Sequence, residues 1–378
     1  METDHLSNLP EPIIHHVLSL LDIKSAFRTS LLSKEWRFHW THIDHLNFEF
    51  DTNFEGCHDF IANVFRHPLN INSVRVHLRC YQGPALEKEL LEKISSHALS
   101  HGAKELETNV ITRFPPTSLG NECQNQLKTL KLGPCTIHSF DRFSSTPYLN
   151  STYYLNSFDR FTSLTSLQLH KVVLSKVGLY DPEKEFDFSF FSSFPNLENL
   201  SLIQCHVPKC KLIFNISAPR LVSLTMSDFS IYETVRIAVP AATLKFFNLN
   251  GKQQHPLPLS MKNCQSLEKA NIDLFAPATT GFLKKAYIFN LTRTMKTLPY
   301  TNSLTVSCTF SSKGKILLYR NSQVAGIKFV DLEESEDQEW LPVALCMVRG
   351  LGLNQLAAKL EEKSKQMVRL APVEIQLV

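Results

Sequence analysis

The pattern Leu-x-x-Leu-x-Leu recurs through the middle of the chain and constrains the fold more than any other feature of the sequence. Three units keep it unchanged, and three more carry apolar substitutions. The six units are Leu127/Leu130/Leu132, Leu164/Leu167/Leu169, Leu197/Leu200/Leu202, Leu221/Leu224/Met226, Leu244/Phe247/Leu249 and Leu267/Ala270/Ile272. Their first residues are 37, 33, 24, 23 and 23 positions apart. Such a period indicates one structural unit repeated along the chain.

Stacking of these units is predicted by the geometry of a strand. Residues three and five places after the first leucine share one face, because alternate side chains of a strand point to the same side. One unit cannot bury this apolar edge alone, so neighbouring units must cover it. The last three steps fall in the roughly 20–29-residue spacing of leucine-rich repeats, and the first two contain insertions. We therefore predict an α/β fold in which residues 127–310 form an irregular leucine-rich-repeat solenoid with a curved parallel sheet. An ordinary α/β domain with leucine-rich strands is the alternative.

The regions on either side of the repeats are less regular. Alternating apolar and polar residues predict strands near 45–50 and 74–80, and helical spacing predicts helices near 60–65 and 86–99. We interpret residues 46–126 as a linker with the first repeats. Residues 311–378 form a divergent C-terminal region, in which an amphipathic helix would cover the open end of the stack. Its apolar residues are Leu353, Leu356, Leu360, Met367 and Leu370.

Before the repeats, the first forty residues predict three short helices. Ile13, Val17 and Leu21 lie at helical spacing, and Pro10 stands near the start, where it costs no hydrogen bond. Asp22 can cap a second helix, and Ser33 a third that carries Trp36 and Trp40. A unit of this size normally needs a metal, disulfides or a partner to be stable. Because no metal or disulfide spacing is present, a partner is expected.

These same residues resemble the plant type of F-box over residues 4–45. The matching elements are Leu9-Pro10, the stretch Ile-Ile-x-x-Val-Leu-x-Leu-Leu over residues 13–21, Arg28-Thr-Ser-Leu-Leu-Ser-Lys34 and Trp36-Arg37-x-x-Trp40. Glu35 and His39 depart from the usual pattern, which has arginine and leucine there. Together with the repeats, residues 4–310 resemble the plant F-box/leucine-rich-repeat family, and residues from 315 onward depart from it.

The resemblance implies that the F-box binds a Skp-type adaptor, and through it a cullin-based ubiquitin ligase. The residues it points to for adaptor contact are Leu9, Pro10, Ile13, Ile14, Val17, Leu31, Leu32 and Trp36. The alternative for each of them is packing within the F-box itself.

The outward positions of the repeats are the candidates for contact with a target protein. In each unit the variable residues between the leucines decide the chemistry of the concave face. We predict target contacts at Lys128, Lys131, Gln168, Glu198, Asn199 and Ser223. These residues are mixed in charge and mildly polar, which favours a protein or peptide over a strongly charged ligand.

Composition argues against several other functions. Glycine is scarce, 12 of 378 residues or about 3% against roughly 7% in ordinary proteins, and no phosphate-binding glycine loop follows a strand. The net charge of +3 and the absence of a basic cluster argue against nucleic acid, and no apolar run is long enough for a membrane helix. We therefore expect no cofactor, no nucleic acid and no membrane partner.

Residues that could support metal binding or catalysis are present but poorly arranged in the sequence. His39, His42 and His45 recur every third residue, a spacing that does not match the zinc-helix pattern. Cys205, His206 and Cys210 are close in sequence, but Cys205 stands at a repeat position where Asn or Cys is usual. No family signature surrounds any of the nine cysteines, so a cysteine enzyme is a remote alternative.

These inferences combine into one functional hypothesis. The odd number of cysteines and the acidic start of the chain favour a reducing compartment, cytoplasm or nucleus, without secretion. We expect a non-enzymatic, substrate-recognition subunit of a cullin-based ubiquitin ligase. The alternative is a leucine-rich-repeat binding scaffold whose F-box-like unit does not act in a ligase.

Overall fold

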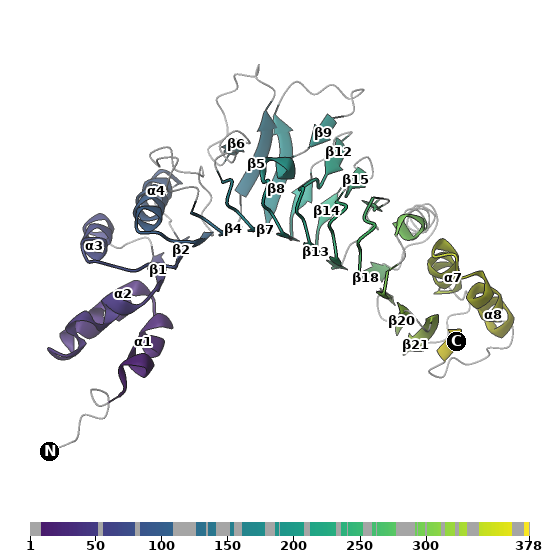
Figure 1. Ribbon diagram of the computed structural model, residues 1–378, viewed down its shortest axis with the longest axis horizontal. Coiled ribbons are helices and arrows are strands. Elements are labelled where there is room, and N and C mark those ends of the chain that lie inside the picture. The colour runs from purple at the N-terminus through teal and green to yellow at the C-terminus, as the bar shows by residue number, and fades with distance from the viewer. Residues whose placement is uncertain are drawn as a thin grey trace. The chain divides into compact units, whose positions relative to one another are not determined.

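The computed structural model divides into two compact units, residues 1–177 and 178–378, and each is described by itself. The residues described are 9–51, 56–79, 84–108, 126–133, 135–140, 152–154, 161–177, 186–188, 190–207, 212–231, 236–239, 241–251, 259–261, 263–276, 292, 294–298, 301–310, 314–321, 325–330, 340–364 and 374–377. The fold is α/β, with short N-terminal helices followed by mainly parallel strands (Figure 1).

The N-terminal helices are α1 (Glu11–Ser19), α2 (Ile23–Arg28) and two 3₁₀ segments, η1 (Thr29–Leu31) and η2 (Trp36–His42). Pro10 precedes α1 with its φ fixed at −57°, and the carboxylate of Asp22 accepts a hydrogen bond from the Ser25 N–H at 3.0 Å. Ser33 Oγ accepts from the Trp36 N–H at 3.3 Å. The three predicted helical segments and the cap at Asp22 are confirmed, whereas the third segment is a 3₁₀ helix whose N-cap is Glu35 and not Ser33.

Five parallel strands follow in the N-terminal unit. They are β1 (His45–Asp51), β2 (Ser73–Arg79), β3 (Glu105–Thr108), β4 (Thr129–Leu132) and β7 (Ser166–His170), hydrogen-bonded in that order. Helices α3 (Cys57–Val64) and α4 (Pro84–Ser100) connect the first three and lie on the same side of them (Figure 1). The strands and helices predicted for this region are confirmed. A second layer contains β8 (Val172–Val177), β5 (Cys135–Phe140) and β6 (Thr152–Tyr154).

The C-terminal unit repeats the same arrangement. Its parallel strands are β10 (Asn199–Ile203), β13 (Ser223–Ser227), β16 (Phe246–Asn250), β18 (Lys269–Ala276) and β19 (Ser303–Phe310). Behind them lie β11 (His206–Val207) paired with β14 (Ser230–Ile231), and β9 (Phe186–Phe188), β12 (Leu212–Asn215), β15 (Arg236–Ala238) and β17 (Leu259–Ser260). The 3₁₀ segment η4 (Phe190–Ser193) precedes β10.

The chain then changes from parallel to antiparallel pairing. Strands β20 (Gly314–Asn321), β21 (Ala325–Val330) and β22 (Glu374–Leu377) extend β19 antiparallel, with α7 (Trp340–Gly350) and α8 (Asn354–Ser364) between β21 and β22. The C-terminal helix that we predicted is present as α8, in which Leu356 and Leu360 are buried. Met367 and Leu370 lie outside the described residues. That α8 covers the open end of the stack stays a prediction. The division of the chain into four parts, at residues 4–45, 46–126, 127–310 and 311–378, also stays a prediction.

The apolar positions of the repeats form the core of both units. The three apolar residues that define each of the six units are all buried, with at most 3% of their surface exposed. Equivalent positions align across neighbouring strands, as in Leu200, Leu224, Phe247 and Ala270. Each apolar row therefore continues from one strand to the next, which is what the repeat spacing requires.

In four repeats, the residue directly after the strand has a left-handed backbone conformation. Lys171, Gln204, Asp228 and Gly251 have positive φ, and each stands two residues after the last apolar residue of its unit. Three of the four are not glycine, so part of the chain's turn geometry is formed by residues that adopt this conformation at a cost.

Candidate functional site

Large apolar side chains are exposed mainly on the N-terminal helices. In the described part of the chain seven are exposed, and six of them lie between residues 13 and 38. These six are Ile13 (48% exposed), Val17 (42%), Leu20 (72%), Leu31 (83%), Leu32 (65%) and Phe38 (54%). We call them the N-terminal apolar surface. The seventh is Phe246 in β16, at 44%.

The spacing of residues along α1 explains much of this surface. Ile14 and Leu18, four residues apart, face inward and are buried. Ile13, Val17 and Leu20 fall on the outer face at positions i, i+4 and i+7. The helix therefore has two apolar faces, and the fold buries only one of them. An apolar cluster exposed in this way is typical of a protein interface.

Two tryptophans of the third helical segment, η2, are buried. Trp36 is 5% exposed and Trp40 is 1% exposed. The Phe27 ring meets Trp40 edge-on at 5.2 Å between centroids and meets Phe60 of α3 at 5.7 Å. Edge-on aromatic pairs of this kind add to the stabilisation from burial. The N-terminal helices are therefore joined to the first strand–helix element of the same unit.

Three histidines meet between α1 and η2. His15 Nε2 lies 3.4 Å from His39 Nδ1, and the His15 ring stacks on His42 with 5.2 Å between centroids. Burial lowers the pKa of the His15 imidazole, and the neighbouring His42 and His39 lower it further, while Glu11 acts in the opposite direction. The neutral form of His15 is therefore favoured in the folded protein.

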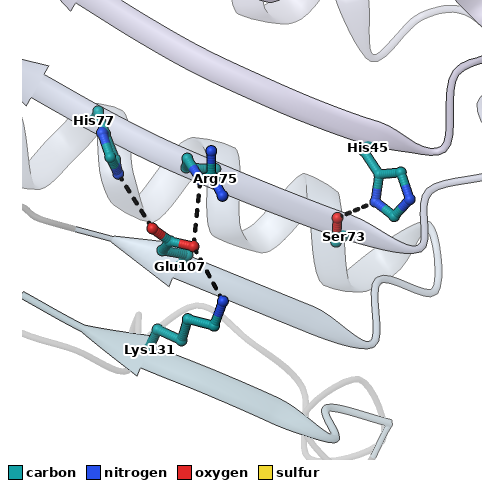
Figure 2. A network of polar contacts seen from close by, with 6 residues as sticks. All are labelled: His45, Ser73, Arg75, His77, Glu107 and Lys131. Atoms are coloured by element: carbon teal, nitrogen blue, oxygen red, sulfur yellow. Dashed lines mark hydrogen bonds and ion pairs between the residues drawn. The ribbon is translucent and has the colours of Figure 1, made fainter. Parts of the chain in front are cut away.

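A charged network covers the exposed face of the first strands (Figure 2). The carboxylate of Glu107 in β3 lies 3.3 Å from Arg75 Nε of β2 and 3.4 Å from Lys131 Nζ of β4. His77 Nε2 approaches the other carboxylate oxygen at 3.5 Å. On the same face, His45 of β1 is hydrogen-bonded to the Ser73 hydroxyl. Four neighbouring strands thus bring together groups that lie far apart in the sequence.

The protonation of Glu107 follows from its neighbours. Partial burial by itself would raise the pKa of this carboxyl. The charges of Arg75 and Lys131, with the hydrogen bonds that both donate, outweigh burial and hold the pKa below its ordinary value. Glu107 therefore stays ionised, although its exposed ion pairs contribute at most about 1 kcal/mol each.

Comparison with known proteins identifies the N-terminal helices. Residues 6–47 match the F-box domain family. This segment is similar to the F-box, and we use that name for it below. The N-terminal apolar surface thus lies entirely on the F-box, and the first strand, β1, begins within the matched residues.

Similarity to plant proteins extends well beyond the F-box. An F-box/LRR-repeat protein of Arabidopsis thaliana is 26% identical over 323 residues, covering 81% of this chain and 60% of the relative. An F-box/FBD/LRR-repeat protein of the same plant is 29% identical over 287 residues, covering 72% and 55%. An FBD-associated F-box protein is 23% identical over 369 residues, covering 90% and 74%. The first two matches thus span 55–60% of those relatives' length. The resemblance to plant-type F-box/leucine-rich-repeat proteins is confirmed.

The structure separates the predicted adaptor-contact residues into two groups. Exposed or partly exposed are Leu9, Pro10, Ile13, Val17, Leu31 and Leu32. Ile14 and Trp36 are buried at 3% and 5% and pack within the F-box, which is the alternative given for every residue of the set. Leu20 and Phe38 are additional exposed residues that the sequence reasoning missed. The spacing of Leu20 from Ile13 and Val17 could have identified it.

The predicted target-contact residues lie at the outer ends and faces of the strands in both units. In the N-terminal unit Lys128 is exposed, and Lys131 and Gln168 are paired across β4 and β7. In the C-terminal unit Glu198 is exposed, and Asn199 pairs with Ser223 across β10 and β13. Lys131 alone of the six belongs to the Glu107 network. Contact with a target stays a prediction for all six.

The exposed strand face of the C-terminal unit has a different chemistry. Its central row consists of Ser201, Thr225, Asn248, Asn271 and Thr305, aligned across five strands. The Asn271 side-chain amide donates a hydrogen bond to Asn248 Oδ1 at 3.3 Å. This row is polar but uncharged, in contrast to the row of Arg75, Glu107 and Lys131 in the N-terminal unit.

The cysteines do not show the features of a catalytic nucleophile in the described residues. Cys57, Cys205, Cys264, Cys308 and Cys346 are buried and form no disulfide with one another. Burial raises the pKa of Cys264 to about 11 and also raises the pKa of Cys346, so both remain protonated thiols. Cys210 lies outside the described residues. Within those residues no group of three or more potential ligands is arranged for a metal, and no helix has the length and apolar character needed to cross a membrane.

Proposed function

We propose that this chain recruits a substrate protein to a cullin-based ubiquitin ligase, with the F-box bound to a Skp-type adaptor. The observation that carries the proposal is the N-terminal apolar surface on a segment that matches the F-box domain family. Leu31 and Leu20 are the most exposed residues of this surface, at 83% and 72%, and burying a leucine fully contributes about 1.5–3 kcal/mol. An adaptor that covers this surface would supply the stabilisation that so small a helical segment lacks on its own.

We further infer that the strands form a leucine-rich-repeat solenoid whose exposed face binds the substrate. Support comes from the buried apolar rows, which run in register through the parallel strands, and from the names of the plant relatives. The chain would carry out no bond chemistry. It would hold a substrate lysine near the conjugating enzyme and so raise its effective concentration. The cytoplasm or nucleus is the expected location.

Adaptor binding can be tested with a matched pair of substitutions. Val17→Asp places a charge in the N-terminal apolar surface, and Phe246→Asp places the same charge on an equally exposed residue of β16. With purified Skp-type adaptor in calorimetry, Val17→Asp should weaken binding roughly 30-fold or more, the effect of losing a residue at the centre of an interface. Phe246→Asp should bind like wild type. Circular dichroism verifies that both variants fold.

A second variant tests the start of the F-box. Leu9→Ala combined with Pro10→Ala should also weaken adaptor binding, because both side chains reach the surface beside α1. If both the double variant and Val17→Asp bound the adaptor as tightly as wild type, the proposed docking surface would be wrong. The adaptor could bind while the cellular levels of all partner proteins stayed independent of ubiquitination. In that case the chain would be a binding scaffold outside a ligase.

A further inference from the structure

The exposed strand face of the C-terminal unit carries a large apolar side chain beside two amides. Phe246 of β16 is 44% exposed, and Asn248 follows it on the same face and pairs with Asn271 of β18. We propose that this surface binds an extended, uncharged segment of the substrate protein, with one apolar side chain of the segment packed on Phe246. The inference rests on the proposed function and deepens it, since it specifies the chemistry of the segment that is recognised. The surface, which we call the Phe246 face, consists of Thr225, Phe246, Asn248, Asn271 and Thr305.

The two amides leave one donor group and one acceptor unused. The Asn271 side-chain amide donates a hydrogen bond to Asn248 Oδ1 at 3.3 Å, and neither side chain makes another hydrogen bond within the described residues. The side-chain N–H groups of Asn248 and the side-chain oxygen of Asn271 therefore have no partner in that part of the chain. Asn271 is exposed and Asn248 is partly exposed, on neighbouring strands about 4.8 Å apart. A ligand can therefore reach both groups.

A peptide main chain offers the groups that these amides lack. Each peptide unit has one N–H donor and one C=O acceptor. In a helix or within a sheet these groups bond to one another, whereas in a lone extended segment they are free. The hydroxyls of Thr225 and Thr305, which both donate and accept, continue the row on either side of the amides. The row therefore matches an extended segment better than a helix.

The charges around the Phe246 face disfavour charged side chains in the segment. Lys245 and Glu268, which directly precede β16 and β18, form an ion pair at 2.9 Å and neutralise each other. A charged side chain placed on the row would lose hydration without meeting an opposite charge in the row itself. Lys269 is exposed beside Phe246, where its methylene stem extends the apolar surface while its ammonium group stays in water. Uncharged polar residues around one apolar residue are therefore favoured.

Phe246 supplies the apolar part of the contact. Outside the F-box, the described residues expose no other large apolar side chain. A single exposed phenylalanine is common in proteins, but this one adjoins an amide pair that has a free donor and a free acceptor. Aromatic residues surrounded by polar groups often contribute most of the binding free energy of an interface. An apolar side chain of the segment would pack on the ring, while the neighbouring main chain bonds to the amides.

The experiment titrates the full chain with four ten-residue peptides of serine, threonine and asparagine, each with an N-terminal trifluoroacetyl group that fluorine NMR detects. The first has a central phenylalanine, and the second is the same peptide N-methylated at its four central peptide nitrogens. The other two have lysine or aspartate in place of the phenylalanine. The phenylalanine peptide should bind, and N-methylation should weaken it about fivefold or more, because it removes N–H donors. The two charged peptides should bind about tenfold more weakly or less.

Two variants locate the binding site, and a third is their matched control. Phe246→Ala should weaken binding of the phenylalanine peptide about tenfold, because the apolar contact is lost. Asn248→Ala removes the free donor and should weaken it about fivefold. Asn263→Ala removes the same amide from an exposed turn of the same unit and should leave the affinity unchanged. Circular dichroism verifies that all three variants fold.

The opposite results would overturn the inference. Absence of binding by the phenylalanine peptide at millimolar concentration, or equal binding of its N-methylated form, would mean that no main chain is recognised. Preference for the aspartate peptide would make Lys269 the binding group, and equal losses in Asn248→Ala and Asn263→Ala would place the peptide elsewhere. Binding of maltotriose in place of the peptide would make the surface a carbohydrate site. Self-association of the chain that Phe246→Ala abolishes would assign the surface to a second copy.

Adaptor binding is measured separately on the same proteins. Failure of peptide binding with adaptor binding retained rejects the Phe246 face alone and leaves the proposed ligase role standing. Peptide binding without adaptor binding has the reverse meaning, because it rejects the ligase role and leaves the Phe246 face as a peptide-binding surface.

Discussion

The F-box helices and the repeat strands are both rich in aliphatic residues, but they place them differently. In the six repeat units every apolar position is buried and aligned with its neighbours. In the F-box, six large apolar side chains remain on the outside, although Ile14, Leu18 and the two tryptophans fill the interior. The repeat strands satisfy their apolar surface by stacking on one another, whereas the F-box leaves part of its surface for another molecule.

Substitution of one leucine in each region should give the largest difference. Leu224→Ala removes a fully buried side chain between Leu200 and Phe247 and should lower the free energy of unfolding by about 2–5 kcal/mol. Leu31→Ala removes one that is 83% exposed and should change it by less than about 0.5 kcal/mol. Urea unfolding followed by circular dichroism measures both. A comparable loss in the two variants would mean that the F-box buries Leu31 in the free protein.

A pair of glycines separates close packing from backbone conformation. Gly251 follows β16 with φ at +136°, and a Cβ there would lie 2.5 Å from the backbone nitrogen of Asp228. Gly251→Ala should therefore destabilise the protein by roughly 1–3 kcal/mol beyond the conformational cost itself. Gly56→Ala, before α3, meets nothing within 4 Å at φ +84° and should cost only the roughly 1 kcal/mol of a left-handed alanine. Equal losses in thermal unfolding would show that the turn at Gly251 can open.

The sequence was sufficient to predict which residues of the repeats are buried. It was not sufficient to predict the turns or the contacts between exposed side chains. Leu224 and its equivalents could be placed because a repeat fixes both the spacing and the side of the strand that is buried. The left-handed turns at Gln204 and Asp228 could not, because neither residue is the glycine that usually marks such a position.

The Glu107 network illustrates the same difference on the exposed face. Lys131 was identified from its repeat position, but Arg75 and Glu107 stand on earlier strands that lack the full leucine pattern. Their contact depends on the register of β2, β3 and β4, which local periodicity does not determine. Leu20 differs from these residues, since helical spacing alone would have assigned it to the outer face of α1.

Lowering the pH should weaken the F-box through its histidines. Because the pKa of His15 is lower in the folded protein than the ordinary value of 6.5, the unfolded chain takes up a proton first. Stability is therefore complete above about pH 6.5 and falls as the pH decreases toward the folded pKa. The pKa of His97 in α4 is also lowered, by burial and by His101 and Lys93, and acts in the same direction. Replacement of His15 should consequently reduce the pH dependence of the free energy of unfolding without abolishing it.

The measurement compares wild type with His15→Gln at pH 7.5 and 5.5. Tryptophan fluorescence during urea unfolding reports on the F-box when Trp340 is replaced by phenylalanine, since Trp36 and Trp40 are the other two of the three tryptophans. Wild type should lose more stability than His15→Gln over this interval, because glutamine at position 15 does not take up a proton. An identical loss in both proteins would place the proton uptake elsewhere in the N-terminal unit. The expected difference is the smallest of the three, since water surrounds much of the histidine cluster and screens its charges.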